Sequence, residues 1–574
     1  MVENLAPHDL ASCGLPQAWA KQGAWTVLDT DFGDGHHFLN TWLAWQGDPL
    51  RPRMLHYVGI APVAPILGRL CDGPENGKHP KGWQALAAQC TDLRPGFHRM
   101  ILEGGSVSLT LCIGDVHALL GEQVFQADTV FATLAADKWA AHMLARRCKR
   151  GTRVTMPAAV HAGAAADTLW SALMQAAGFQ WDGPSPTHTG FTGSFNPHWD
   201  IPSSRTPTRH VVQHPARCAI VGAGIAGASV AHALALRGWD VTVFDRAATP
   251  ASGASGLPVG LAVPHVSADD NPRARLSRNG SLLLAQHADR MLVQGQDWDP
   301  CGVEERRPDG STLWHPLACW IKPAQLVGAW LAHSGIRFVG DSTVSGLQHG
   351  NGLWQLHAPQ GRDLGQFEVV VLANALGSTP LLDALPADTP LGSDLRDKLA
   401  ALQAVYGTLS YGSYAQSVPG LPTTPVNGNG CFIPRIPSPT GDQWFAGSTF
   451  ETDAVLATDL AAQHAANMAR LRQLEPMEGV DLAATLERGS VAQWSATRCV
   501  THDRLPLVGP VDTGSSTGLW LCVGMGSRGL SFSALCAELL AARLGGEPLP
   551  MEFSLSRSLD VNRVRRRPTK TDQA

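Results

Sequence analysis

The sequence lacks the cysteine patterns of metal-binding and disulfide-linked proteins. Its 12 cysteines are scattered singly from Cys13 to Cys536, with no CxxC pair and no Cys/His group at zinc-binding spacing. We therefore predict reduced thiols and no bound metal. Only four residues are Tyr, against 18 Trp, and neither number indicates a function.

Long apolar runs and a strong charge imbalance are also absent. No apolar stretch reaches the roughly 18 residues of a membrane-spanning helix, and the N-terminus has no basic-then-apolar signal pattern. The 44 Lys+Arg and 49 Asp+Glu give a net charge of −5, and this overall charge does not indicate nucleic-acid binding. We expect a soluble, cytoplasmic protein without a membrane partner. The basic ending, 563–570, is either a solvated terminus or a phosphate-contacting tail.

What the sequence does contain is a nucleotide-binding signature in the segment 218–245. It reads as a buried strand, a glycine turn, an apolar helix and a second strand. Gly222 permits the tight turn, Gly224 lets the backbone approach a pyrophosphate, and Gly227 lets the helix pack closely. Asp245, 18 residues past Gly227, is placed to accept from a ribose hydroxyl. The segment predicts a dinucleotide site; the alternative is a glycine turn that binds nothing.

A second glycine turn, 524–530, opens a helix near the C-terminus and favours FAD over NAD. A flavin needs hydrogen-bond donors near its pyrimidine ring, where negative charge collects on reduction. Proteins that bind NAD rarely repeat a glycine turn at the far end of the chain. The alternative is a plain tight turn. The residues of this turn predicted to contact the flavin are Gly526, Ser527, Gly529 and Leu530.

The length and the pattern indicate two fused α/β units. We predict a Rossmann-like first domain over 1–182, a Pro/Ser/Thr/His-rich linker over 183–215, and an FAD-binding Rossmann domain over 216–574. In the first domain, strands are expected at 25–31, 55–60, 107–113, 128–132 and 153–156, and helices at 36–45, 139–148 and 167–177. In the second domain, 369–374 returns to the nucleotide sheet and 533–544 is a helix. An inserted β-rich substrate domain is expected to contain 335–340, 354–357 and 402–448.

A substrate that resembles an amino acid needs a clamp for its carboxylate, and arginine supplies one with two parallel hydrogen bonds. Arg498, Arg504 and Arg528 lie in or near the closing block of the chain. Each of them is also a candidate for a surface or structural ion pair. Lys322 is a further candidate over the substrate domain.

The first domain carries a second possible cofactor loop. Asp31, Gly33 and Gly35 follow a predicted strand and resemble the DxGxG loop of S-adenosylmethionine-dependent methyltransferases, and Asp115 fits the adenine side. No carboxylate stands at 59–62, where that fold places the acid that holds the ribose. A non-binding α/β domain is the alternative.

Together these stretches resemble the MnmC family of bifunctional enzymes that modify the wobble uridine of tRNA, almost from end to end. The resemblance rests on 33–45, 114–115, 220–227, 251–256, 320–326, 372–374, 498–509, 526–530 and 560–563. It implies a C-terminal FAD oxidoreductase of the D-amino-acid/glycine oxidase type, with Arg246, Ser252, Ser255 and Gly256 also at the flavin. Such an enzyme oxidises the carboxymethylaminomethyl group of the uridine to aminomethyl, and the N-terminal half then methylates this amine from S-adenosylmethionine.

The first half departs from the family at the residues that would perform methylation. Ala61 and Pro62 stand where the family has a Glu-Lys pair, and Thr133 replaces the expected catalytic Asp. The segment 190–195 lacks the expected Lys-Arg pair. Because a neutral threonine is no base near neutral pH, we predict little or no methyltransferase activity.

Three functions therefore compete. The first is a tRNA-modifying FAD oxidase with a degenerate methyltransferase domain. The second is a working bifunctional enzyme whose methyl site is built from other residues. The third is a small-molecule amino-acid oxidase whose first domain is structural or docks tRNA.

Overall fold

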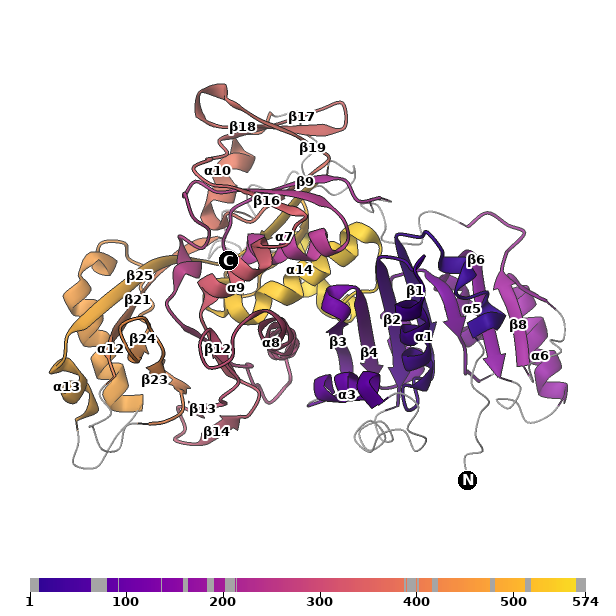
Figure 1. Ribbon diagram of the computed structural model, residues 1–574, viewed down its shortest axis with the longest axis horizontal. Coiled ribbons are helices and arrows are strands. Elements are labelled where there is room, and N and C mark those ends of the chain that lie inside the picture. The colour runs from indigo at the N-terminus through magenta and orange to yellow at the C-terminus, as the bar shows by residue number, and fades with distance from the viewer. Residues whose placement is uncertain are drawn as a thin grey trace, which may run out of the picture. The chain divides into compact units, whose positions relative to one another are not determined.

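The computed structural model describes residues 10–62, 80–90, 92–135, 137–157, 164–182, 190–201, 212, 214–386, 389, 399, 402–414, 422–474, 481–511 and 518–563. The chain divides into two compact units. The first contains Met1–Pro215, Leu236–Gly238 and Ala541–Arg557, and the second contains the remainder. Figure 1 labels the elements of both units.

The first unit is built on an eight-stranded sheet, in which only β3 and β8 run against the other strands. Consecutive residues of a strand point to opposite faces, so Val27 belongs to one hydrophobic core and Leu28 to the other. In spatial order the strands are β3 (Gly96–Leu102), β4 (Val107–Ile113), β2 (Met54–Ala61), β1 (Ala24–Asp29), β5 (Ala127–Phe131), β6 (Cys148–Pro157), β8 (Gly190–Phe195) and β7 (Phe179–Trp181).

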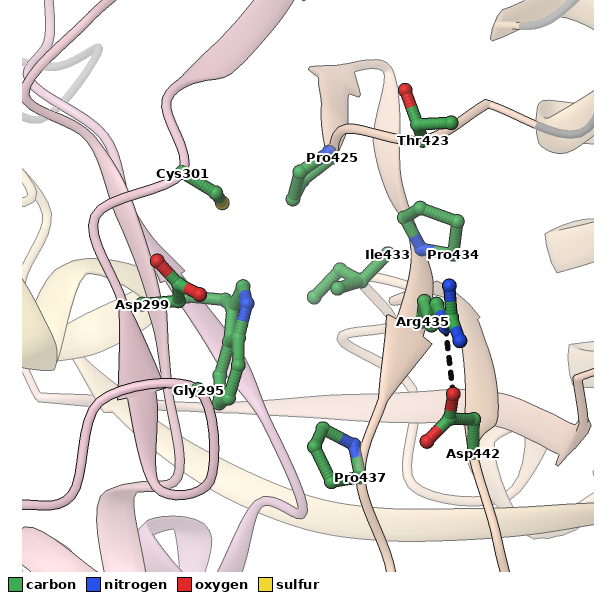
Figure 2. A pocket seen from close by; sticks show the side chains of 11 residues that line it. Gly295, Asp299, Cys301, Thr423, Pro425, Ile433, Pro434, Arg435, Pro437 and Asp442 are labelled. Carbon is green, nitrogen blue, oxygen red and sulfur yellow. Dashed lines mark hydrogen bonds and ion pairs between the residues drawn. The ribbon is translucent and has the colours of Figure 1, made fainter.

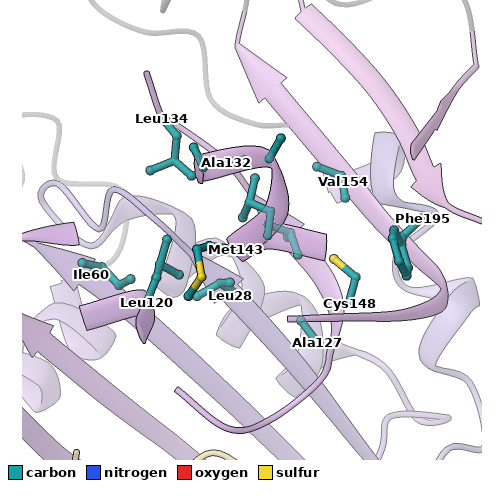
Figure 3. Close-up of a cluster of buried hydrophobic side chains, with 14 of the residues drawn as sticks. Leu28, Ile60, Leu120, Ala127, Ala132, Leu134, Met143, Cys148, Val154 and Phe195 are labelled. Atoms are coloured by element: carbon teal, nitrogen blue, oxygen red, sulfur yellow. The ribbon is translucent and has the colours of Figure 1, made fainter. Parts of the chain in front are cut away.

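Helices cover both faces of this sheet. The first core takes Phe38 and Trp42 from α1 (His36–Gly47) and Trp83 from α3 (Pro80–Gln89). The opposite core, part of which Figure 3 shows, takes side chains from α4 (Val116–Gly121), α5 (Lys138–Arg146) and α6 (Ala164–Ala176). This doubly wound arrangement agrees with the methyltransferase-type Rossmann fold predicted for the first half.

A buried ionic group lies within the first unit. Arg237 donates through Nε to both carboxylate oxygens of Glu547, at 2.9 and 2.8 Å. His56 Nε2 lies 3.6 Å from the same carboxylate, and its Nδ1 is 2.8 Å from Ser108 Oγ. The side chains of Arg237 and Glu547 are only 4% and 10% exposed, so the free energy of unfolding depends on their staying paired.

The second unit carries a parallel sheet closed by one antiparallel strand, β26. The glycine-turn helix α7 (Ile225–Leu236) is almost wholly buried, and α14 (Gly529–Gly545) packs beside it. The sheet order is β16 (Ile336–Val339), β10 (Asp240–Phe244), β9 (Arg217–Val221), β20 (Val369–Leu372), β27 (Leu519–Val523) and β26 (Leu507–Pro510). An antiparallel layer of β17 (Gly346–Gly350), β18 (Leu353–His357) and β19 (Asp363–Phe367) shares a hydrophobic core with it.

The inserted β-rich domain is a seven-stranded sheet. Helices α12 (Leu460–Leu474) and α13 (Leu482–Glu487) pack on one face of it (Figure 1). Its strands are β14 (Thr312–His315), β13 (Val303–Arg306), β22 (Val426–Gly428), β23 (Gly430–Ile436), β24 (Gln443–Gly447), β21 (Gln403–Ser413) and β25 (Val491–Val500). A small sheet of β11 (Gly260–Ala262), β15 (Cys319–Ile321) and β12 (Trp298–Asp299), with helices α8 (Pro272–Met291), α9 (Pro323–Leu331) and α10 (Ser378–Asp383), completes the unit.

Three sequence-based assignments need correction. The segment 335–340 was expected in the inserted domain, but β16 pairs in parallel with β10 at the edge of the nucleotide sheet. The segment 354–357 belongs to the β17–β19 layer rather than to the substrate sheet. Within the predicted linker, Gly190–Phe195 forms β8, which pairs with β6 and β7. For β16 and β8 the strand pattern is local, but β10 and β6, with which they pair, are distant in sequence.

Several absences hold within the described ranges. None of the cysteines there forms a disulfide, and no group of three or more His, Cys, Asp or Glu residues could hold a metal. No helix among the described residues is long and apolar enough to cross a membrane. The predicted basic tail falls almost wholly outside these ranges, which end at residue 563.

Candidate active site

The first glycine turn follows β9 and opens α7. Gly222 has φ of +104°, and a Cβ on it would meet the Ala373 carbonyl oxygen at 2.8 Å. A Cβ on Gly227 would lie 1.8 Å from the Gly222 carbonyl oxygen, so α7 packs this closely only because position 227 is glycine. At Gly224 a Cβ would have within 4 Å only the Ser255 hydroxyl, at 3.2 Å. The turn therefore leaves open the approach that a pyrophosphate needs.

Two side chains hold this turn in place. Asp245, just after β10, accepts from the Ala223 N–H at 2.7 Å and from the Ala247 N–H at 2.9 Å. Ser255 Oγ accepts from the Ile225 N–H at 2.8 Å. A carboxylate has about four acceptor sites, so Asp245 keeps acceptor capacity for a ribose hydroxyl. These residues fit the adenosine and pyrophosphate parts of FAD.

A cavity of about 1360 Å³ connects the two glycine turns with the substrate sheet. Gly227 and Gly256 do not line it: they permit close backbone packing instead, since a Cβ on Gly256 would lie 2.6 Å from the Ala251 carbonyl oxygen. The predicted cofactor residues that do line it are Gly222, Gly224, Asp245, Arg246, Ser252, Ser255, Gly526, Ser527, Gly529 and Leu530.

Other lining segments escaped the sequence reasoning. Residues 342–345 follow β16 and residues 373–377 follow β20, so both lie at the carboxyl edge of the parallel sheet. The hairpin residues 427–431 reach the cavity from the substrate sheet. Residues 342–345 and 373–377 could have been identified by placing β16 and β20 in one sheet, because the segments that follow them then lie at the same sheet edge.

Arg498, on β25, lines this cavity with a positive charge that no described acid neutralises. It donates to the Thr449 carbonyl oxygen at 3.3 Å and also to Ser448 Oγ, both neutral partners. Burial lowers the pKa of Arg498, against a smaller opposing effect of Cys431. Buried charges in proteins are normally paired, so a guanidinium whose described partners are neutral is able to pair with an anion of a bound ligand.

Arg498 also lies close to the second glycine turn. Val500, the last residue of β25, forms a β-bridge with Met525 inside that turn. Two residues along a strand span roughly 7 Å, and residues at that spacing share a face. Arg470, on α12, was not predicted: it lines the same cavity and donates to the Ser448 carbonyl oxygen at 2.8 Å.

Arg528 lines the cavity from the second glycine turn itself. Burial lowers the pKa of Arg528, and the neighbouring guanidinium groups of Arg273 and Arg504 lower it further, against a smaller opposing effect of Glu305. Three like charges thus gather where one carboxylate partly balances them. This part of the cavity has a positive potential that favours anionic ligands.

Lys322 does not lie with these arginines. Its ammonium group donates to the Pro437 carbonyl oxygen at 2.9 Å, and it is not among the residues that line the large cavity. Pro437 lines a separate cavity of about 240 Å³. Figure 2 shows Asp299 and Cys301 on one wall of that cavity and Arg435, paired with Asp442, on the opposite wall. Neither 222–227 nor 524–530, the two glycine turns of the large cavity, lines this smaller cavity, so we do not assign it to the chemistry.

In the first unit, the predicted methyltransferase loop follows β1. Gly33 and Gly35 have φ of +56° and +81°, and Gly35 is the N-cap residue of α1. The acid at the end of the strand is Asp29 rather than Asp31, because β1 ends two residues earlier than predicted. The Asp31 N–H donates to Asp29 Oδ1 at 3.1 Å.

Asp29 belongs to a group of titratable side chains that the sequence reasoning missed. The Tyr57 hydroxyl donates to Asp29 Oδ2 at 2.7 Å, and His37 Nδ1 lies 3.6 Å from the same oxygen. Burial acts to lower the pKa of His37, but the carboxylates, chiefly Asp29, raise it overall. Burial, reinforced by Asp29, raises the pKa of Tyr57 well above its usual value. In the sequence, the only indication of Asp29 is that a second acid, Asp31, lies two residues after it.

The positions expected for the ribose acid and for the catalytic acid, 61 and 133, hold no carboxylate. Asp115 caps α4 by accepting from the Ala118 N–H at 2.9 Å. Ala61, the last residue of β2, is fully buried. Thr133 follows β5 and donates its N–H to Thr30 Oγ1 at 2.8 Å. Asp128 cannot substitute, because it sits near the start of β5 and pairs with Lys149. These residues do not fit the ribose and catalytic roles.

Comparison with known proteins agrees with the flavin geometry. A family model described as FAD dependent oxidoreductase matches residues 217–303 and 284–543, more than half of the chain. The second half is therefore an FAD-dependent oxidoreductase. Among solved structures, glycine oxidase from Geobacillus kaustophilus matches with a TM-score of 0.48 and 18% identity, over 62% of this chain and 100% of its own.

Similarity to curated proteins extends through both halves. The tRNA 5-methylaminomethyl-2-thiouridine biosynthesis bifunctional protein MnmC of Albidiferax ferrireducens is 45% identical, over 98% of this chain and 97% of its own length. Its counterpart in Polaromonas naphthalenivorans is 40% identical, over 95% of this chain and 91% of its own length. The chain belongs to the MnmC family.

Proposed function

We propose that this protein oxidises the carboxymethylaminomethyl group on the wobble uridine of tRNA to an aminomethyl group, in the cytoplasm, with FAD as its cofactor. The curated relatives are named for the biosynthesis of a modified tRNA uridine, which supports this substrate. The single observation that carries the proposal is Arg498, a guanidinium whose partners among the described residues are neutral and which lines the same cavity as both glycine turns. The substrate's carboxylate is the anion it pairs with.

The chemistry removes two electrons from the carboxymethyl carbon. When bound, FAD accepts these electrons together with a proton as hydride. The C–H bond of the arm breaks and a C=N bond forms to the neighbouring nitrogen. Water then adds to this imine, and the C–N bond breaks to give the aminomethyl nucleoside and glyoxylate. The substrate thus loses a hydride from carbon and a proton from nitrogen to solvent, two protons and two electrons in all, and one water enters.

The protein's own residues position this reaction. Arg498 and Arg470, both anchored at Ser448, hold the carboxylate end of the arm against the second glycine turn. Arg528 supplies positive charge from the turn itself. Holding the arm in a reactive geometry lowers the barrier without a titratable base. No imidazole or carboxylate is assigned as a base here.

We propose further that the first unit does not transfer a methyl group. Ala61 and Thr133 leave the expected ribose and catalytic positions without a carboxylate. Losing both the acid that binds the ribose and the catalytic acid is harder to compensate than losing one of them. We propose that this unit contributes to holding tRNA.

One binding experiment and one spectroscopic experiment test the oxidase assignment. Bulk tRNA from a strain lacking this gene should be retained with the protein on filters, and should bleach the flavin under anaerobic conditions. Glycine or sarcosine at the same concentration should bleach it far more slowly. Rapid bleaching by these small amines without any tRNA binding would instead identify a small-molecule amino-acid oxidase.

A further inference from the structure

An exposed aromatic ring stands at the opening of the large cavity. Phe450 lines the cavity, yet 46% of it remains exposed to solvent. The backbone on both sides is fixed: the Thr449 N–H donates to the Thr408 carbonyl oxygen at 3.1 Å, and Glu451 exchanges backbone hydrogen bonds of 2.8 and 2.9 Å with Tyr406. Phe450 therefore presents an apolar surface, on a backbone held in place, that a ligand of the cavity can contact.

Arg504 extends over this ring, with its guanidinium carbon 6.0 Å from the ring centroid of Phe450. The Arg504 backbone has φ of +61°, a conformation that non-glycine residues rarely adopt. Its turn is held by Thr501 Oγ1, which donates to the Leu505 carbonyl oxygen at 2.7 Å, and by hydrogen bonds from Arg563. The structure thus fixes a strained turn that places a cation over an exposed ring.

No acid among the described residues forms an ion pair with Arg504, so its charge is available to a ligand. The adjacent carboxylate, Asp503, is bound by Arg563 at 2.9 and 3.1 Å, and this pairing helps to lower the pKa of Asp503 against the opposing effect of burial. Arg504 and Arg273 each lower the pKa of the neighbouring Arg528, after the larger effect of burial. Arg273 is 2.8 Å from His265 Nε2, a neutral partner whose pKa is lowered first by burial and then by Arg273 and Arg528.

Unpaired nucleotides fit this surface best. It combines an aromatic face, a guanidinium over that face and excess positive charge. Nucleobases stack on aromatic rings, arginine adds a cation–π contact, and the excess charge attracts phosphates. A second copy of this chain or an acidic protein would use the charge, but neither requires a flat ring beside a guanidinium.

We infer that Phe450 and Arg504 form a stacking platform for a nucleobase next to the modified uridine. The platform holds a single-stranded RNA segment at the cavity mouth while the uridine arm reaches Arg498. This inference rests on the proposed function, because it places the anticodon loop at the oxidase site.

The test separates RNA docking from the oxidation itself. Phe450→Ala, Phe450→Trp and Arg504→Ala are compared with wild-type holoenzyme by anaerobic flavin bleaching, first with tRNA that carries the carboxymethylaminomethyl group and then with the free carboxymethylaminomethyl nucleoside. Val455→Ala is the matched control, since Val455 is 76% exposed on the following segment but does not line the cavity. Flavin content reports whether each variant has folded.

We expect Phe450→Ala to raise KM for tRNA about five- to a hundredfold, with kcat and the reaction of the free nucleoside unchanged. Phe450→Trp should retain wild-type KM, Arg504→Ala should raise it, and Val455→Ala should not. An unchanged KM for tRNA in flavin-loaded Phe450→Ala, or an equal loss on tRNA and free nucleoside, would overturn the platform. Failure of the wild-type protein to bleach with any tRNA would instead overturn the proposed function.

Discussion

Gly407 offers a way to move Arg498 without removing it. Gly407 lies on β21 opposite β25, and a Cβ there would come 2.4 Å from Arg498 Nη2 and 2.6 Å from its Cζ and Nη1. Ordinary contacts begin near 3.4 Å, so Gly407→Ala must displace the guanidinium by about 1 Å. The displaced group is the far end of a flexible side chain, and alanine suits a strand better than glycine, so the fold should survive.

A displacement of about 1 Å in a positioning group costs up to about a hundredfold in rate. Removing the pair altogether by Arg498→Ala costs on the order of 1.5–3 kcal/mol, or about ten- to a hundredfold. We therefore expect Gly407→Ala to lose about ten- to a hundredfold in kcat/KM, with FAD bound normally.

The assay is anaerobic flavin reduction by tRNA that carries the carboxymethylaminomethyl group. Gly350→Ala is the control, because Gly350 also lies in a strand, β17, but a Cβ there meets nothing within 4 Å. The control should behave as wild type. Wild-type kinetics in flavin-loaded Gly407→Ala and Arg498→Ala would show that Arg498 does not bind the substrate carboxylate.

Two further predictions concern the cofactor and the first unit. Gly224→Asp should abolish flavin binding, because its carboxylate would occupy the space through which the pyrophosphate approaches. The flavin absorbance of the purified variant measures this. Full flavin occupancy would refute the site. Burial alone would raise the pKa of Glu547, but Arg237 and His56 lower it to about 2. Because this folded-state pKa is depressed, the pair should stabilise the first unit by about 3 kcal/mol above the ordinary pKa near 4.5, and lose this as pH falls toward 2. Glu547→Gln should therefore be less stable than wild type in denaturant at pH 7, with the difference shrinking at pH 3; a difference that is constant with pH would contradict the pairing.

The parts of the fold that sequence reasoning identified are those whose signals are local. Gly222, Gly224 and Gly227 lie within six residues between an apolar strand and an apolar helix, so the turn was identifiable. β8 was taken for linker because Gly190–Phe195 is rich in small and polar residues and gains its strand character only by pairing with β6. β16 reads as a strand, but no local pattern reveals that it pairs with β10.

The candidate site shows the same division. The sequence nominated Arg498 and Arg528 from composition and position, but Arg470 joins them only because α12 packs on the substrate sheet and brings it to Ser448. Lys322 was indistinguishable from these arginines until its ammonium group was seen bound to Pro437. Asp29 was passed over for Asp31 because the end of β1 could not be located to within two residues.

A single-turnover reaction decides between the activities. Flavin-loaded protein is mixed anaerobically with tRNA carrying carboxymethylaminomethyluridine and with labelled S-adenosylmethionine, and the nucleosides are then analysed by mass spectrometry. We predict one aminomethyluridine formed for each flavin reduced, with no labelled methyl group on the wobble base. Unchanged carboxymethylaminomethyluridine beside an oxidised flavin would contradict the oxidase assignment, and label entering the wobble base would contradict the loss of methyl transfer.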